Sequence, residues 1–117
     1  MTLANWLSQF DSHGIYFESV LAELEQFGIT YDAEHRKLSA NDRSVVAPVY
    51  SSKAHKQAII DRGLGGQIQS GDWRGFTGYE LAEALCRLLG LGNPGAAFEG
   101  RGFIFRACLK AIEEAKR

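Results

Sequence analysis

The sequence has few of the residues that would reveal an activity directly. Its 117 residues include two cysteines, two prolines, one methionine and three histidines. The histidines and cysteines are not arranged at metal-ligand spacing, and no serine stands in a Gly-x-Ser-x-Gly elbow. No apolar run approaches the ~18 residues that a membrane span requires. We therefore predict no catalytic residue, no metal site, no cofactor and no membrane association.

The sequence also lacks a strong charge of either sign. Its formal net charge is −1, which argues against nucleic-acid binding driven by overall charge. Residues 36–56 are locally basic, and a nucleic-acid accessory role for this segment is a weaker hypothesis. The basic side chains there are Arg36, Lys37, Arg43, Lys53, His55 and Lys56.

The overall composition is that of an ordinary globular protein. Apolar residues make up 45% and charged residues 23%, so we expect residues 1–117 to form one domain. The N-terminal residues lack the pattern of a signal peptide, which favours a cytoplasmic protein. Cys86 and Cys108 fall on or beside apolar helix faces, and we expect them to be buried free thiols in a reducing compartment.

Two helices are predicted in the N-terminal quarter. Apolar residues from Leu3 to Phe10 follow helical spacing, with Thr2 as a possible N-cap, and predict a helix over residues 2–11. A second apolar stripe runs from Phe17 to Phe27. Gly28 is expected to end that helix, with Ile29 placed against Leu24 in a Schellman motif. A three-residue connection predicts an antiparallel or L-shaped helical pair.

The middle of the chain has weaker signals. Residues 29–39 suggest a hairpin around a turn at 32–36, although a short helix capped by Asp32 is an alternative. Residues 44–50 are rich in β-branched side chains but contain Pro48, so any strand there should be short or at an edge. A surface helix is predicted from Ser51 or Ser52 to about Arg62.

The C-terminal part is predicted to be helical. Thr77 and Glu80 have the spacing of a capping box, in which each side chain accepts from the other residue's backbone N–H. That helix should end at Gly90 or Gly92, and a last helix should begin near Gly102. The predicted fold is mainly α with a small β element (α+β). It has about five helices, plus a short hairpin or edge strands in the middle.

Three Arg-Gly junctions suggest an anion site. They are Arg62-Gly63, Arg74-Gly75 and Arg101-Gly102, and the last two stand just before predicted helix starts. Helix N-terminal N–H groups, glycine and guanidinium groups together bind anions, and Arg106 lies about one turn into the last helix. The same residues are also consistent with two alternatives. One is ordinary turn and helix-cap chemistry, and the other is an ion pair of Glu99 with Arg101 or with Arg106.

The loop at residues 71–76 has the composition of a recognition surface. Asp72, Trp73, Arg74 and Phe76 bring an acid, an indole, a guanidinium and a phenyl ring together between glycines. Trp and Arg are enriched at interface hot spots. In the alternative interpretation, Trp73 and Phe76 anchor the loop to the core, and Asp72 pairs with Arg74.

Two functional hypotheses follow. The first is a small non-catalytic protein-binding domain of the inhibitor, immunity or accessory type, acting through the loop around Trp73. The second is a domain for a small anion or a nucleotide-like ligand, possibly an enzyme, built from Arg62, Arg74, Arg101 and Arg106. Convergence of the Arg-Gly junctions into a cleft would favour the ligand, and their dispersal would favour the protein partner.

Overall fold

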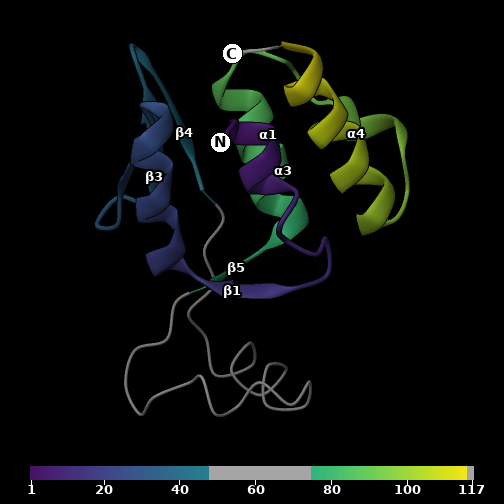
Figure 1. Cartoon of the computed structure of the whole chain (residues 1–117), viewed down its shortest axis with the longest axis horizontal. Coiled ribbons are helices and arrows are strands. Elements are labelled where there is room, and N and C mark those ends of the chain that lie inside the picture. Colours follow the sequence, from purple (N-terminus) through teal and green to yellow (C-terminus); the bar gives the residue numbers. More distant parts are fainter. Residues whose placement is uncertain (48–74, 116–117) are drawn as a thin grey trace.

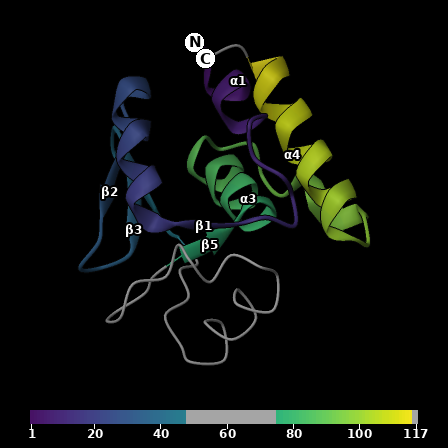
Figure 2. The ribbon, with the colours of Figure 1, turned by 60° about the horizontal axis from the view of Figure 1, so that its bottom comes forward.

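The central element of the structure is helix α3 (Gly78–Leu88). The structure is a computed structural model that describes residues 1–47 and 75–115. Figures 1 and 2 both show α3 between a three-stranded sheet on one side and helix α4 (Arg101–Ala115) on the other. Leu81, Leu85 and Leu88 of α3 are each no more than 1% exposed. This central burial makes α3 the helix around which the core is built.

Helix α1 (Leu3–Leu7) is shorter than the predicted helix over residues 2–11. Thr2 is the N-cap as predicted, and its hydroxyl accepts from the Asn5 N–H at 3.1 Å. The chain leaves the helix after Leu7, and the Phe10 ring packs edge-on against both Trp6 and Tyr16, each at 4.8 Å between centroids. The prediction that the helix continues to residue 11 was therefore wrong, because Phe10 packs against Trp6 and Tyr16 and does not continue the helix.

A strand of a two-stranded sheet follows the expected connection at residues 12–14, before the second helix. Strand β1 (Ile15–Phe17) pairs antiparallel with β5 (Gly75–Thr77), and Tyr16 lies opposite Phe76. The two strands are distant in the sequence, so no local pattern indicated the pairing. The predicted helical pair joined by a short turn is thus corrected to helix, strand, helix.

The second predicted helix is present as η1 (Glu18–Phe27), a 3₁₀-helix drawn in blue in Figure 1. Gly28 has φ +76°, the left-handed conformation. The Gly28 N–H donates to the Glu25 carbonyl at 3.0 Å and the Ile29 N–H to the Leu24 carbonyl at 3.2 Å. This is the Schellman motif that the sequence predicted. The indole N–H of Trp6 donates to Glu23 Oε1 at 3.2 Å and so links η1 to α1.

The expected β element in the middle of the chain is a three-stranded antiparallel sheet. Strands β2 (Thr30–Asp32), β3 (Lys37–Ala40) and β4 (Arg43–Val46) lie side by side in chain order. The hairpin prediction for residues 29–39 is confirmed. Strand β4 is four residues long and lies at the sheet edge, as predicted from Pro48.

The start of α3 confirms Thr77 as N-cap but corrects the capping box. The Thr77 hydroxyl donates to Glu80 Oε1 at 2.5 Å instead of accepting from a backbone N–H. The first N–H groups of α3 donate to the loop before β1, from Gly78 to the Gly14 carbonyl and from Tyr79 to the Ser12 carbonyl, both at 3.2 Å. Carbonyl groups of the loop therefore accept from the first N–H groups of α3, where the sequence predicted that the Thr77 side chain would do so.

The C-terminal helices agree closely with prediction. Gly90, with φ +74°, follows the end of α3, a 3₁₀ turn η3 (Pro94–Ala97) follows, and α4 begins at Arg101. Phe105, Cys108 and Ile112 of α4 are buried. Cys86 and Cys108 are buried free thiols, as expected.

The architecture is α+β, with a difference in helix number. Within residues 1–47 and 75–115 there are four helices, α1, η1, α3 and α4, apart from the single turn η3, where about five were expected for the chain. The remaining prediction, a helix from Ser51 or Ser52 to Arg62, lies outside the described residues.

Candidate binding surfaces

The N-terminal ends of α3 and α4 meet at Tyr79 and Arg101. The Arg101 guanidinium lies over the Tyr79 ring, 5.3 Å from its centroid. Burial raises the pKa of Tyr79, the Glu80 carboxylate adds to the increase, and the Arg101 charge opposes it. This cation–π contact holds an exposed guanidinium at a defined place on the surface.

Exposed aromatic side chains lie in the same stretch of the chain. Phe98 is 48% exposed and Phe103 is 57% exposed. The Arg106 guanidinium lies 5.0 Å from the centroid of the Phe103 ring. We call Tyr79, Phe98, Arg101, Phe103 and Arg106 the arginine–aromatic surface, and these residues lie around the N-terminal ends of α3 and α4. Arg101 and Phe103 are two residues apart in α4 and project to different sides of the helix, so the two arginine–ring contacts are separate.

The charges of α4 run against the helix dipole. Arg101 is the first residue of the helix, and the first turn contains no acidic residue. Glu113 and Glu114 lie in the last turn, which has no basic residue within the described helix. Carboxylates favour helix N-termini and cations favour C-termini, each by about 0.3–1 kcal/mol. Helix stability therefore does not explain why Arg101 stands where it does.

The structure places three of the predicted site residues. Phe76 is 2% exposed and packs against Phe10 and Tyr16, with centroids 6.3 and 5.9 Å away. Its side chain thus belongs to the core. Arg101 and Arg106 are exposed and contact two different aromatic rings.

The other predicted site residues, Arg62, Asp72, Trp73 and Arg74, lie outside the described residues. Convergence of the Arg-Gly junctions is therefore not determined. The ion pairs considered for Glu99 are not formed, since among the described residues no salt bridge joins Glu99 to Arg101 or Arg106. Sequence reasoning missed Phe98, Phe103 and Tyr79, because aromatic residues beside a helix start are more often core than surface.

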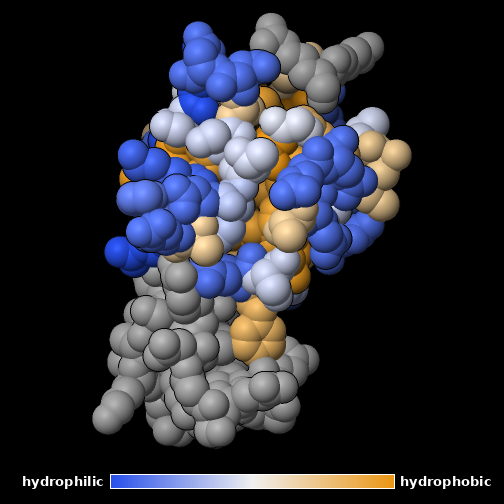
Figure 3. Space-filling model, turned by 90° about the vertical axis from the view of Figure 1, so that its left-hand side faces the viewer, coloured by the Kyte–Doolittle hydropathy of each residue, from blue (hydrophilic) through white to orange (hydrophobic). Residues whose placement is uncertain are grey.

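A hollow opens between η1 and strand β2 on another face of the molecule. Its volume is about 240 Å³. Figure 3 faces the side that η1 and the three-stranded sheet occupy in Figure 1, and it shows apolar surface between two groups of hydrophilic side chains. The described lining residues are Glu18, Ser19, Ala22, Glu25, Tyr31 and Ala33. None of these six residues was predicted from the sequence to form a site.

The turn between β2 and β3 contains another polar cluster. The Asp32 carboxylate accepts from the Glu34 N–H at 3.0 Å and lies 2.7 Å from His35 Nδ1. The hydrogen bond with His35 lowers the pKa of Asp32. All three side chains are exposed, and the hydrogen bonds are those expected of an Asp-initiated turn.

No family model, curated protein or solved structure matches the chain. In the described ranges, 1–47 and 75–115, none of the helices has both the length and the apolar content needed to cross a bilayer.

Proposed function

We propose that this chain is a small non-catalytic protein-binding domain of the inhibitor, immunity or accessory type. The observation that supports the proposal is the arginine–aromatic surface. Phe98 and Phe103 are large apolar side chains left about half exposed. The guanidinium groups of Arg101 and Arg106 lie over the Tyr79 and Phe103 rings, respectively. Aromatic residues and arginine are the side chains most enriched at protein interfaces.

The charge pattern of α4 supports the same proposal. Arg101 at the first position of the helix opposes the dipole, and such conflicts with local stability are typical of functional positions. A partner with an acidic and apolar surface would complement Arg101, Phe103 and Arg106.

The loop around Trp73 is the second part of the proposed interface. Trp73 and Arg74 precede Gly75, the first residue of β5, and Tyr79 follows in the first turn of α3. The same stretch of chain thus leads from the loop to the arginine–aromatic surface. A cytoplasmic location also belongs to the proposal, and the two free buried thiols support it.

The alternative function is binding of a small anion or a nucleotide-like ligand by Arg62, Arg74, Arg101 and Arg106. The described part of the chain offers no observation that favours it. The guanidinium groups of Arg101 and Arg106 contact different rings. The described lining of the hollow carries carboxylates and no cation. The protein-binding proposal is therefore preferred.

The experiment is capture of a partner on the immobilised wild-type chain, followed by calorimetry with purified variants. We expect Phe103→Ala/Arg106→Ala to weaken binding by about 2 kcal/mol or more, the threshold for hot-spot residues. Glu34→Ala/Lys37→Ala, at exposed positions of the turn before β3 and of β3, is the control away from α4 and should bind normally. Equal affinity of the two double variants would show that α4 does not form the interface.

A further inference from the structure

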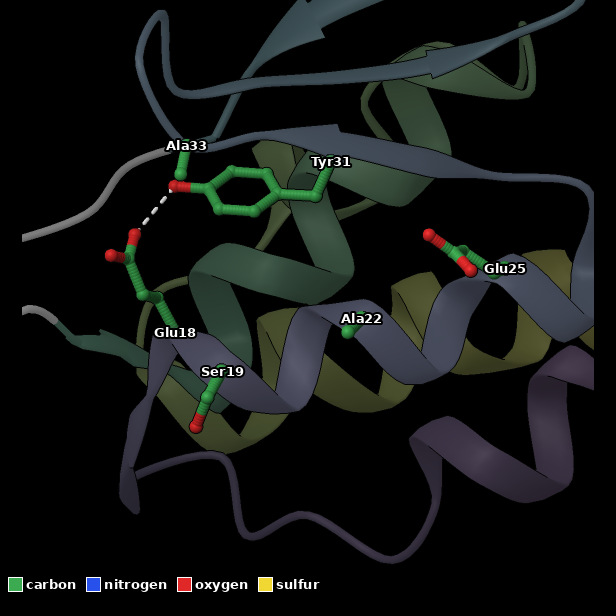
Figure 4. Close-up of a pocket in the computed structure, with 6 residues that line it drawn as sticks. All are labelled: Glu18, Ser19, Ala22, Glu25, Tyr31 and Ala33. Carbon is green, nitrogen blue, oxygen red and sulfur yellow. Dashed lines mark hydrogen bonds between the residues drawn. The ribbon is translucent and has the colours of Figure 1, made fainter.

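The hollow between η1 and β2 has a shape that follows from the 3₁₀ geometry of η1. Residues three apart lie above one another in a 3₁₀-helix, so Ser19, Ala22 and Glu25 form one row. Ala22 lies between the other two and has a short side chain, so the space above it forms the deepest part of the hollow. Figure 4 shows Tyr31 of β2 on the opposite side, with its ring facing the helix across the hollow.

Tyr31 is held in this position by its hydroxyl. The Tyr31 O–H donates to Glu18 Oε2 at 2.8 Å. Figure 4 shows the Glu18 carboxylate at one end of the Tyr31 ring and the Glu25 carboxylate beyond the other end. The hollow therefore combines an aromatic face, an alanine methyl and two carboxylates, and both charged groups in its described lining are negative.

The position of Glu25 does not add to the stability of the helix. It lies in the last turn of η1, at the negative end of the dipole. No hydrogen bond or ion pair with another side chain of the described chain engages its carboxylate. Glu18, in the first turn, is favourably placed by the same rule. The position of Glu25 is thus explained by neither the helix nor a neighbouring side chain.

We propose that this hollow binds a primary alkylammonium group, the chemistry of a lysine side chain or a small aliphatic amine. The methylene groups would lie between the Tyr31 ring and the Ala22 methyl, and the ammonium group would meet the Glu25 carboxylate. The ring and the methyl group would bury the methylene groups, and the carboxylate attracts the ammonium group. The site is separate from the arginine–aromatic surface, and the proposal does not depend on the one for that surface.

The experiment is an NMR titration of the full chain at low ionic strength. The probes are n-butylammonium, N-acetyl-lysine methylamide and the norleucine analogue of the latter, which lacks the ammonium group. Shifts should centre on the Ala22 and Ala33 methyl groups, and the lysine compound should bind about fivefold more tightly than the norleucine compound. Addition of 0.5 M salt should weaken the lysine compound.

Variants then assign the groups. Glu25→Gln should weaken the lysine compound by about threefold, whereas Glu113→Gln, an exposed glutamate on α4, should have no effect. Tyr31→Phe keeps the ring but loses the hydrogen bond to Glu18 that orients it, so part of the affinity should remain, and Tyr31→Leu should lose it. Binding of n-butylammonium supports the ammonium group as the recognised unit. Binding of the lysine compound alone supports a polypeptide source.

Two results would overturn the proposal. One is equal affinity for the lysine and norleucine compounds. The other is an affinity for the lysine compound that is unchanged by Glu25→Gln while the methyl spectrum shows a native fold.

Discussion

Gly78, the first residue of α3, lies directly against the backbone carbonyl oxygen of Asp11, and a Cβ on Gly78 would overlap that oxygen. The Gly78 N–H also donates to the Gly14 carbonyl at 3.2 Å, so the two backbones are held together. The loop at residues 11–14 and the start of α3 thus form one closely packed unit.

The first prediction follows from that contact. Gly78→Ala should lower the free energy of unfolding by about 1–3 kcal/mol, because the loop must move to make room for the methyl group. Gly102→Ala is the matched control, since the nearest atom to its Cβ is Ser12 Oγ at 3.8 Å. That change should raise stability by about 1 kcal/mol through helix propensity. Similar losses in urea denaturation for both variants would contradict the packing described here.

The second prediction concerns Thr77 and Glu80. Thr77→Ala should reduce stability by about 1–2 kcal/mol, because a partly buried hydrogen bond to a carboxylate is lost. A double-mutant cycle with Glu80→Ala separates this bond from other effects of either change. We expect a coupling energy of about 1 kcal/mol. Additive losses would show that the hydroxyl–carboxylate bond contributes nothing.

The third prediction tests the contact between Arg101 and Tyr79. A positive charge near a phenol favours the phenolate and lowers its pKa. Arg101→Gln should therefore raise the Tyr79 pKa further above its usual value of 10.0, as followed by NMR of the labelled ring. Arg106→Gln, whose guanidinium contacts Phe103 instead, should leave the titration unchanged. A Tyr79 pKa insensitive to Arg101→Gln would place the guanidinium elsewhere.

The fourth prediction concerns the buried thiols. Cys86 and Cys108 are both 0% exposed, so a thiol reagent should label neither cysteine rapidly at pH 8 without denaturant. The hydrogen bond with Cys108 and burial also raise the pKa of Cys86. In the unfolded chain the Cys86 thiol loses its proton near its usual pKa of ~8.5. In the folded protein the thiol stays protonated at that pH. Its contribution to stability is present below that pH and is lost as the pH rises. Rapid labelling of the native protein would refute the core assignment.

The fifth prediction tests the loop that the sequence singled out. Trp73→Ala/Arg74→Ala should leave the fold intact by circular dichroism and weaken binding to a captured partner by about 2 kcal/mol or more. An unfolded double variant would mean that Trp73 anchors the core. A folded variant that binds normally would place the interface elsewhere, with Arg101 and Arg106 as the next candidates.

Local features of the fold were predictable because their determinants are close together in the chain. The Schellman motif at Gly28 depends on a glycine and on two hydrogen bonds within six residues. The hairpin of β2 and β3 depends on a short turn, and the buried face of α4 on its apolar spacing. Each is specified by residues in one segment, so sequence alone determined it.

Tertiary structure decided what depends on distant segments. The pairing of Tyr16 with Phe76 brought β1 into a sheet where the second helix was expected to begin, and the Ser12 and Gly14 carbonyls replaced the predicted cap of α3. The site residues follow the same rule. Arg101 was recognisable from its glycine and helix start, but its contact with Tyr79 requires two helices to meet. The hollow requires the Tyr31 ring of one strand to face Ala22 of a helix, a juxtaposition that packing alone creates.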